Sequence, residues 1–322
     1  MEGENNMRKY IVVFIAIVLY GNLTSCQTNQ EKFPELTGPY LGQNPPGMKP
    51  EIFAPGVLST DANEFNAAFT PSGDAVYFTG KGEEGQDIFV IETENGLWQE
   101  RKPASFSDNY RDVDPFITYD GNKLFFSSNR PVEGENANED CDFWYVEKLI
   151  SGKWGEAKYL DFPSTQCKND FYYVTSRDGA IYYSIFGDDN KGDIYFIPPS
   201  PAMQVPIRLN SPINTDYNEH DPFIAPDGSY LIFTSTRPGG YGSADLYICF
   251  KNTDGIWSDP VNMGENINSG KYDYCAILSP DEKYLFFSSN RSGNDDVYWV
   301  DAKIIEDMRP KEPEPLYKET LQ

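Results

Sequence analysis

The sequence is poor in basic residues and contains a single histidine. Lys and Arg total 26 against 50 Asp and Glu, which gives a formal net charge of −24. A surface this acidic repels phosphate backbones and anionic lipid headgroups, so nucleic acid is excluded as a partner, and so is a basic membrane-binding patch. His220 has neither a second histidine nor a Cys-x-x-Cys motif with which to complete a usual zinc site. It stands between Glu219 and Asp221, and the sequence leaves two alternatives for it, a base or ligand and a structural residue.

Motifs for nucleotide binding and for nucleophilic catalysis are also missing. Segment 80–85 fits Gly-x-Gly-x-x-Gly, the motif of dinucleotide-binding loops. Strand-forming residues follow it where that motif needs a helix, and its two carboxylates would face the phosphates of the dinucleotide, so this interpretation fails. No Gly-x-Ser-x-Gly elbow occurs. The sequence therefore predicts no cofactor. Calcium stays open as an alternative for two acidic loops, 133–142 and 188–193, whose spacing does not match an EF-hand.

Long apolar runs are absent except for one near the N-terminus. Arg8 and Lys9 precede the apolar run 10–19, which is short for a membrane-spanning helix. A basic head before a short apolar stretch is typical of a secretory signal peptide. We therefore predict that residues 1–25 are a signal peptide.

The residues after this run indicate how the protein is attached. The sequence Leu-Thr-Ser-Cys at 23–26 resembles the lipobox of bacterial lipoproteins, in which the cysteine carries the lipid. This resemblance implies lipidation at Cys26 and a place in the bacterial cell envelope, with an ordinary signal peptide as the alternative. The residue after the lipid site is Gln27, and in this the sequence resembles lipoproteins that are sorted to the outer membrane. Whether the domain faces the periplasm or the cell surface stays open.

The sequence has one feature in abundance, a repeat that ends in Asp, an aliphatic or aromatic residue, and an aromatic residue. The Asp positions are separated by 55, 51, 52 and 51 residues. A period near 52 residues filled with strand-forming residues is typical of a β-propeller. The five phrases are Asp87-Ile88-Phe89, Asp142-Phe143-Trp144, Asp193-Ile194-Tyr195, Asp245-Leu246-Tyr247 and Asp296-Val297-Tyr298.

The fourth repeat shows how one blade is built. Residues 221–224 form a first strand that leads into the turn Ala-Pro-Asp-Gly. The second strand, 230–235, is dense in aromatic and β-branched residues. A Gly-rich loop precedes the third strand, 245–250, and an outer strand follows over 257–263. Four antiparallel strands make one blade of an all-β propeller.

The fifth repeat stops after its third strand, near Ile304, and would leave an unpaired edge. Segment 53–58 reproduces the Pro-x-x-Leu/Met spacing of 206–209 and 260–263. We therefore predict that residues near 51–60 supply the missing strand and close the ring. This gives five four-stranded blades, or six if a degenerate blade is hidden.

The two ends of the chain are rich in proline and show no strand periodicity, which indicates extended, solvated segments. The predicted organisation is a signal peptide (1–25), a flexible tether (26–50), the propeller (51–304) and a solvated tail (305–322).

Segments 226–237 and 281–291 resemble the WD40-like (PD40-type) repeat of TolB-type propellers, and the resemblance covers about residues 51–304. The whole chain also resembles a group of exported bacterial lipoproteins for which no function is established. Two repeats depart from the pattern, with Lys81 in the first and Phe186-Gly187 in the third where others have Ser-x-Arg. TolB-type proteins usually carry six blades and a further domain, so a Tol-system role is not carried over.

Each first strand begins with an acidic or amide residue, and first strands line the central channel of a propeller. Such a ring at the channel mouth suits a cation, a polyhydroxylated ligand, or acid/base chemistry. Their repetition in every blade favours hydrogen bonds within the blades instead, since a catalytic residue is needed only once. The residues are Asn66, Asp114, Asp170, Asp221 and Asp273.

Arginines recur at the ends of three second strands, on the same face as those acids: Arg130, Arg237 and Arg291. They suit carboxylates of a glycan or peptide, but pairing with a neighbouring Asp is favoured.

Four cysteines remain besides Cys26. Cys141 and Cys167 are expected on the same face, where a disulfide is geometrically feasible in an oxidising compartment. Cys249 and Cys275 fall within or at the start of strands, which is typical of buried thiols.

These observations predict a lipid-anchored, exported propeller that binds a protein or a glycan at the channel mouth without catalysis. The alternative is a glycan-active hydrolase or lyase that uses the channel carboxylates.

Overall fold

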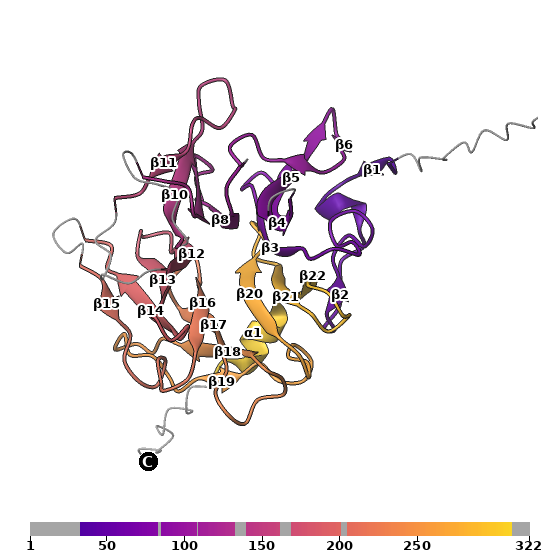
Figure 1. Cartoon of the computed structure of the whole chain (residues 1–322). Helices are drawn as coiled ribbons and strands as arrows, with labels where there is room; N and C mark the ends of the chain where they lie inside the picture. The colour runs from indigo at the N-terminus through magenta and orange to yellow at the C-terminus, as the bar shows by residue number, and fades with distance from the viewer. Residues whose placement is uncertain are drawn as a thin grey trace, which may run out of the picture. The chain divides into compact units, whose positions relative to one another are not determined.

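The computed structural model describes residues 33–82, 85–107, 109–132, 140–161, 169–200 and 205–310. From Glu35 onward the chain forms one compact unit built from five antiparallel sheets (Figure 1). Each sheet packs on the next, and the fifth packs back on the first through contacts of β21 with β3. The chain is a five-bladed β-propeller, as predicted, and the six-bladed alternative is wrong.

Each blade runs from an inner strand at the channel to a two-residue outer strand. Blade 1 contains β3 (Phe65–Phe69), β4 (Ala75–Lys81), β5 (Gln86–Glu94) and β7 (Lys102–Pro103), and is extended by β6 (Leu97–Trp98) and β1 (Leu36–Thr37). Blade 2 contains β8 (Asp112–Ile117), β9 (Lys123–Ser128), β10 (Asp142–Glu147) and β11 (Lys158–Tyr159). Blade 3 contains β12 (Asn169–Thr175), β13 (Ile181–Phe186), β14 (Gly192–Ile197) and β15 (Ile207–Arg208).

Blade 4 contains β16 (Glu219–Ile224), β17 (Tyr230–Ser235), β18 (Asp245–Phe250) and β19 (Val261–Asn262). Blade 5 contains β20 (Asp273–Leu278), β21 (Tyr284–Ser289), β22 (Asp296–Asp301) and β2 (Glu51–Ile52). The remaining elements are a 3₁₀ turn, η1 (Tyr40–Gly42), and one short helix, α1 (Lys303–Met308).

The middle strands form the core because neighbouring blades cover both of their faces. Every residue of β17 and β18 is buried, including the polar ones at their ends. A strand covered on both faces gains more from large apolar side chains than from alternation of polar and apolar residues. The turns between first and second strands use glycine with positive φ, 70° at Gly73 and Gly121 and 74° at Gly228, a conformation that other residues rarely adopt.

The N-terminal segment closes the ring. Strand β2 pairs with β22, with Glu51 opposite Trp299 and Ile52 opposite Tyr298. The Phe53 N–H then donates to the Val297 carbonyl at 2.7 Å. The predicted closure is therefore confirmed.

The predicted register of the closing strand is wrong by five residues. Phe53, not Leu58, occupies the place of Leu209 and Met263, whose N–H groups bond to the equivalent carbonyls of their own third strands. Segment 54–58 instead folds into a tight turn in which the Val57 and Leu58 N–H groups both donate to the Ala54 carbonyl. The Pro-x-x-Leu spacing belongs to that turn.

The described residues of both predicted flanking segments include short regular elements. Part of the predicted tether pairs as β1 or packs on the core, where Leu41 is buried and the Tyr40 hydroxyl donates to Asp281 at 2.7 Å. Helix α1, which was not predicted, begins within the last predicted sheet and buries Ile304 and Ile305. Apolar side chains in otherwise polar segments explain both differences. No helix in the described ranges is long and apolar enough to cross a bilayer, and Cys26 lies outside those ranges.

Candidate functional site

Each inner strand contains one bulge at which a residue other than glycine adopts the left-handed conformation. Register with the second strand shifts at the same place in every blade. We call these five residues the channel ring: Asn66, Asp114, Tyr172, Asp221 and Cys275, with φ between 49° and 60°. A bulge with left-handed backbone bends the strand and re-aims its side chain.

The bulge also explains a hydroxyl residue near the end of three of the second strands. The backbone N–H of Asp114 donates to Thr79 Oγ1 of the preceding blade at 3.1 Å, and that of Asp221 donates to Ser184 Oγ at 2.9 Å. Asn66 is held by Ser288 Oγ of the last blade in the same way, at 3.0 Å. These hydroxyl groups therefore fix the bulges across blade interfaces.

A second ring of carboxylates, which we call the acid ring, lies two residues before the channel ring. Its members are buried, and four of them form ion pairs with arginine. The pairs are Glu64–Arg101 (2.6 Å), Asp112–Arg130 (2.7 Å), Glu219–Arg237 (3.3 Å) and Asp273–Arg291 (2.6 Å), and the fifth member is Asp170. The acids singled out from the sequence therefore belong to two rings, with Asp170 and Asp273 in this one.

Blade 1 obtains its arginine from an unexpected place. Lys81 is exposed at the end of β4 and faces Gln86, so it does not replace the arginine of other blades. The strand pairing puts Gly82 at the position that arginine occupies in blades 2, 4 and 5. A Cβ at Gly82 would lie 1.8 Å from Asp87 Oδ2, so no larger side chain fits there beside that carboxylate. Arg101, just before β7, reaches Glu64 instead. The sequence pattern missed it because it lies outside the Ser-x-Arg phrase.

Blade 3 has no such arginine. Strand pairing places Ile185 and Gly187 where the other repeats have Ser and Arg. Asp170 is buried, and its Oδ1 atom has no hydrogen-bond partner within the described part of the chain. Burial, with a smaller contribution from the charge of Asp142, raises the pKa of Asp170 to about 7.

Rings of aromatic side chains surround the channel mouth. The residues between the acid ring and the channel ring are Phe65, Val113, Phe171, His220 and Tyr274, and Phe186 and Tyr272 lie beside them. Their ring centroids form a chain with separations of 5.7 Å for Phe171–Phe186, 5.6 Å for Phe186–His220, 6.0 Å for His220–Tyr272, 5.2 Å for Tyr272–Tyr274 and 5.9 Å for Tyr274–Phe65. We call this chain the aromatic belt. It lines an open cavity of about 210 Å³.

Two carboxylates from opposite parts of the channel ring lie at the floor of this cavity. Burial, and then the charge of Asp221, raise the pKa of Asp114 to about 7, against the opposing effects of Arg111 and a hydrogen bond from Asn66. The Cys275 thiol donates to Asp221 Oδ2 at 3.5 Å. Asp114 and Asp221 therefore occupy unequal environments within one cavity.

His220 links the belt to the floor. Its Nε2 atom is hydrogen-bonded to the Tyr272 hydroxyl at 2.7 Å. Its Nδ1 atom lies 3.0 Å from Asp221 Oδ2, but this contact is not aligned as a hydrogen bond, and Nδ1 has no other partner in the described ranges. The single histidine thus lies at the mouth, buried between Tyr272 of the belt and Asp221 of the floor.

Tyr172 closes the channel below the floor. Its side chain is buried and crosses from blade 3 to blade 5, where its hydroxyl donates to the Ala276 carbonyl at 2.7 Å. The inner strands end at the opposite opening, a separate cavity of about 110 Å³ to which Tyr119 and Arg177 contribute. The mouth is therefore a one-sided cavity.

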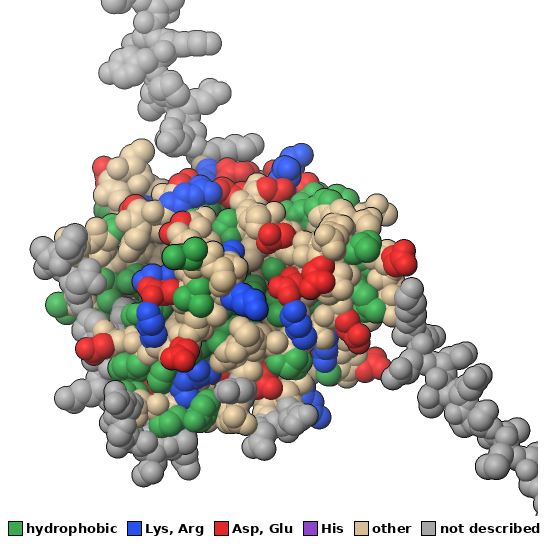
Figure 2. Space-filling view, turned by 90° about the horizontal axis from the view of Figure 1, so that it is seen from above, with side chains coloured by type: hydrophobic (Ala, Val, Ile, Leu, Met, Phe, Trp, Pro, Cys, Tyr) green, Lys and Arg blue, Asp and Glu red, His purple; other side chains and the backbone are tan. Residues whose placement is uncertain are grey.

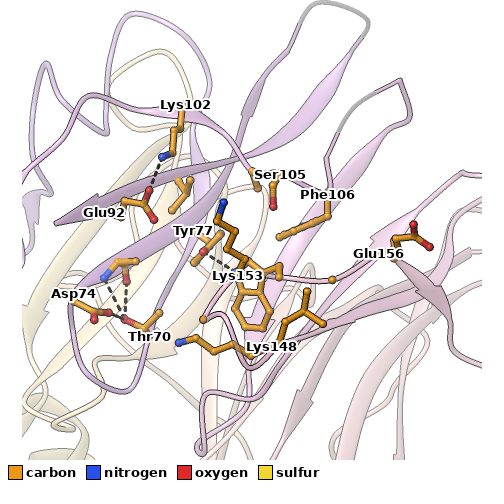
Figure 3. Close-up of a pocket in the computed structure, with 18 of the residues that line it drawn as sticks. Thr70, Asp74, Tyr77, Glu92, Lys102, Ser105, Phe106, Lys148, Lys153 and Glu156 are labelled. Carbon is orange, nitrogen blue, oxygen red and sulfur yellow. Dashed lines mark hydrogen bonds and ion pairs between the residues drawn. The ribbon is translucent and has the colours of Figure 1, made fainter. Parts of the chain in front are cut away.

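A larger hollow of about 860 Å³ lies between blades 1 and 2 (Figure 3). Several of its polar groups bond to one another: Lys102 to Glu92, Thr70 to Asp74, and Trp154 Nε1 to the Tyr77 hydroxyl. Acidic and basic side chains are mixed over the face shown in Figure 2, without a large region of one sign. Two buried polar residues line it, Thr70 and Arg130, and both already have partners, Asp74 and Asp112.

The predicted disulfide stays a prediction. Cys141 is buried beside Arg111, and Cys167 lies outside the described residues. Cys249 and Cys275 are buried thiols, as expected. Among the described residues, no group of three His, Cys, Asp or Glu side chains is placed to hold a metal ion.

No family model matches the chain, and no curated protein matches its sequence. Solved structures do resemble the fold of this chain. A family-43 glycoside hydrolase has a TM-score of 0.51 at 12% identity over 80% of this chain and 97% of its own, and an endo-arabinase from Bacteroides thetaiotaomicron has 0.50 at 10% over 75% and 94%. A protein assigned as TolB from Agrobacterium tumefaciens has 0.49 at 18% over 74% and 77%. What the first two share with this chain is the fold. At these identities the likeness extends to the propeller and leaves activity to be argued from the site.

Proposed function

We propose that the protein is an exported, lipid-anchored β-propeller whose channel mouth binds one side chain of a partner protein without catalysing a reaction. The observation that carries the proposal is the mouth itself, a cavity closed below by Tyr172, walled by aromatic rings and floored by buried polar groups. Its volume of about 210 Å³ is below the roughly 300 Å³ at which pockets for whole small molecules begin. Such a cavity suits one unit of a larger ligand.

The location in the cell rests on the N-terminal sequence. The Leu-x-Ser-Cys phrase ending at Cys26 supports lipid attachment, and Gln27 supports sorting to the outer membrane. A net charge of −24 leaves the lipid, rather than a basic patch, as the attachment to the membrane. The proposal includes no cofactor.

A second candidate function is glycan hydrolysis or cleavage by Asp114 and Asp221. The observation that favours it is their unequal environments, since a carboxyl with a pKa of about 7 beside a second carboxylate suits general acid and base roles. Turnover of a glycan that disappears in Asp114→Asn, with folding unchanged, would establish this candidate in place of the first.

Photo-crosslinking on intact cells tests the binding proposal. p-Benzoylphenylalanine replaces Tyr274 in the aromatic belt, and in a matched variant it replaces Tyr119 at the opposite opening. We expect light-dependent adducts with one defined protein from position 274 and none of that protein from position 119. The same adduct from both positions would contradict binding at the mouth, and an adduct removed by glycosidases would identify a glycan as the ligand.

A further inference from the structure

We infer, on the basis of the proposed binding role, that the group entering the channel mouth is a cation: a primary ammonium on an unbranched alkyl chain, as in a lysine side chain. Three features carry this inference: the aromatic belt, the pair of carboxylates at the floor, and the position of Arg111 at the rim.

The aromatic belt provides walls that attract cations. Five phenyl or phenol rings and one imidazole follow one another around the mouth at centroid separations between 5.2 and 6.0 Å. Aromatic faces attract ammonium groups, and cages of several rings are how proteins bind alkylammonium ligands. Neutral aromatic walls alone would accept any apolar group, so the floor decides the charge of the ligand.

Among the described residues, no arginine forms an ion pair with either carboxylate at the floor. In the acid ring, four carboxylates are paired with arginine. Asp114 and Asp221, by contrast, contact Asn66, His220 and Cys275. An ammonium group at the floor would supply the missing positive charge and three donors for these oxygens.

The shape of the cavity favours lysine over larger cations. A volume of about 210 Å³ accommodates an alkyl chain with a compact head. A guanidinium is planar and wider, and carries its donors in a fixed fork. In blade 2 the residue at the equivalent position is Val113, the smallest of the five, and it lines the cavity together with Asp114.

Arg111 shows that the belt already holds a cation at its rim. Its guanidinium lies over the Phe171 ring, 5.4 Å from the centroid, and its Nε donates to Gln86 Oε1 at 2.9 Å. It also lowers the pKa of Asp114, so its charge reaches the floor. Arg111 therefore opposes an entering cation and would assist an entering anion, which makes it the residue that distinguishes the two.

The test uses Nα-acetyl-lysine methylamide as the probe and its norleucine analogue, which has the same chain without the charge, as the control. Isothermal titration calorimetry on the whole protein at pH 8 is expected to show an affinity for the lysine probe about tenfold above that for the norleucine analogue. The affinity of Asp221→Asn for the lysine probe is expected to be about tenfold lower than that of the wild type. Each tenfold change corresponds to about 1.4 kcal/mol. Arg111→Gln is expected to strengthen lysine binding several-fold. Glu219→Gln, which removes a buried acid two residues away on the same strand, is expected to leave it unchanged.

Equal affinity for the two compounds, no binding of the lysine probe, or weaker lysine binding in Arg111→Gln would each overturn the inference. Stronger binding of Nα-acetyl-glutamate methylamide would replace the cation with an anion. If position 274 still crosslinks a partner while the lysine probe fails, the binding role stands and only the ligand class is wrong.

Discussion

Phe53→Ala is expected to lower the free energy of unfolding by about 4 kcal/mol, as for other fully buried aromatic residues. Phe53 follows the closing strand β2 and has no exposed surface. Its ring packs edge-on against Phe286 and Trp299 of blade 5, both at 5.1 Å, and against Phe69 of blade 1 at 5.8 Å. Removing it leaves a cavity where the first and last blades meet.

Chemical denaturation followed by tryptophan fluorescence measures this loss. The matched control is Tyr241→Ala, an aromatic residue that is 51% exposed in a loop of blade 4, for which we expect a change below about 0.5 kcal/mol. A loss below about 1 kcal/mol in Phe53→Ala would mean that the closing segment adds little to the ring.

Asp170→Asn is expected to stabilise the protein at and above neutral pH, in contrast to most substitutions of buried acids. The pKa of Asp170 is about 7 in the folded protein and about 3.9 in an unfolded chain. Between these values the folded state keeps a proton that the unfolded state has lost, so stability falls as the pH rises. The total penalty is about 4 kcal/mol and is complete above pH 7.

Unfolding free energies of the wild type and Asp170→Asn between pH 4 and pH 8 test this prediction. The difference in favour of the variant should be absent near pH 4 and increase towards pH 8. Comparing the two proteins at each pH cancels the similar contribution of Asp114, whose pKa is also raised. A constant difference would contradict the raised pKa of Asp170. A loss of stability in the variant that grows with pH would indicate a cation bound there.

The repeat made the architecture predictable because each blade contains the same turn and strand chemistry. The closing Asp phrases fall within or at the start of the third strands β5, β10, β14, β18 and β22. Ring closure was also predictable, since a fifth blade without an outer strand leaves an edge that another segment must cover. Its register was not, because the tight turn after Ala54 has the same Pro-x-x-Leu spacing as an outer strand.

The site was only partly predictable because the left-handed bulge changes which residues are equivalent. Asp114 and Asp273 occupy similar places in the sequence pattern, yet Asp114 faces the channel and Asp273 faces Arg291. The aromatic belt carries no motif at all, since Phe65, Phe171 and Tyr274 resemble core residues in sequence. His220 and Asp221 were identified from their residue types, but only the folded structure brings Tyr272 and Cys275 to them.

The mouth is expected to bind the partner, whereas the acid ring is expected to serve the fold. One comparison separates these two roles: Phe65→Ala in the belt and Glu219→Gln in the acid ring, each measured for unfolding free energy and for crosslinking through position 274. We predict that Phe65→Ala abolishes the adduct at a loss of about 1 kcal/mol, because its side chain is only partly buried. Glu219→Gln should lower stability by about 3 kcal/mol, because Arg237 loses its partner, while the folded protein keeps its adduct. The reverse pattern, with capture lost in Glu219→Gln and kept in Phe65→Ala, would contradict these roles.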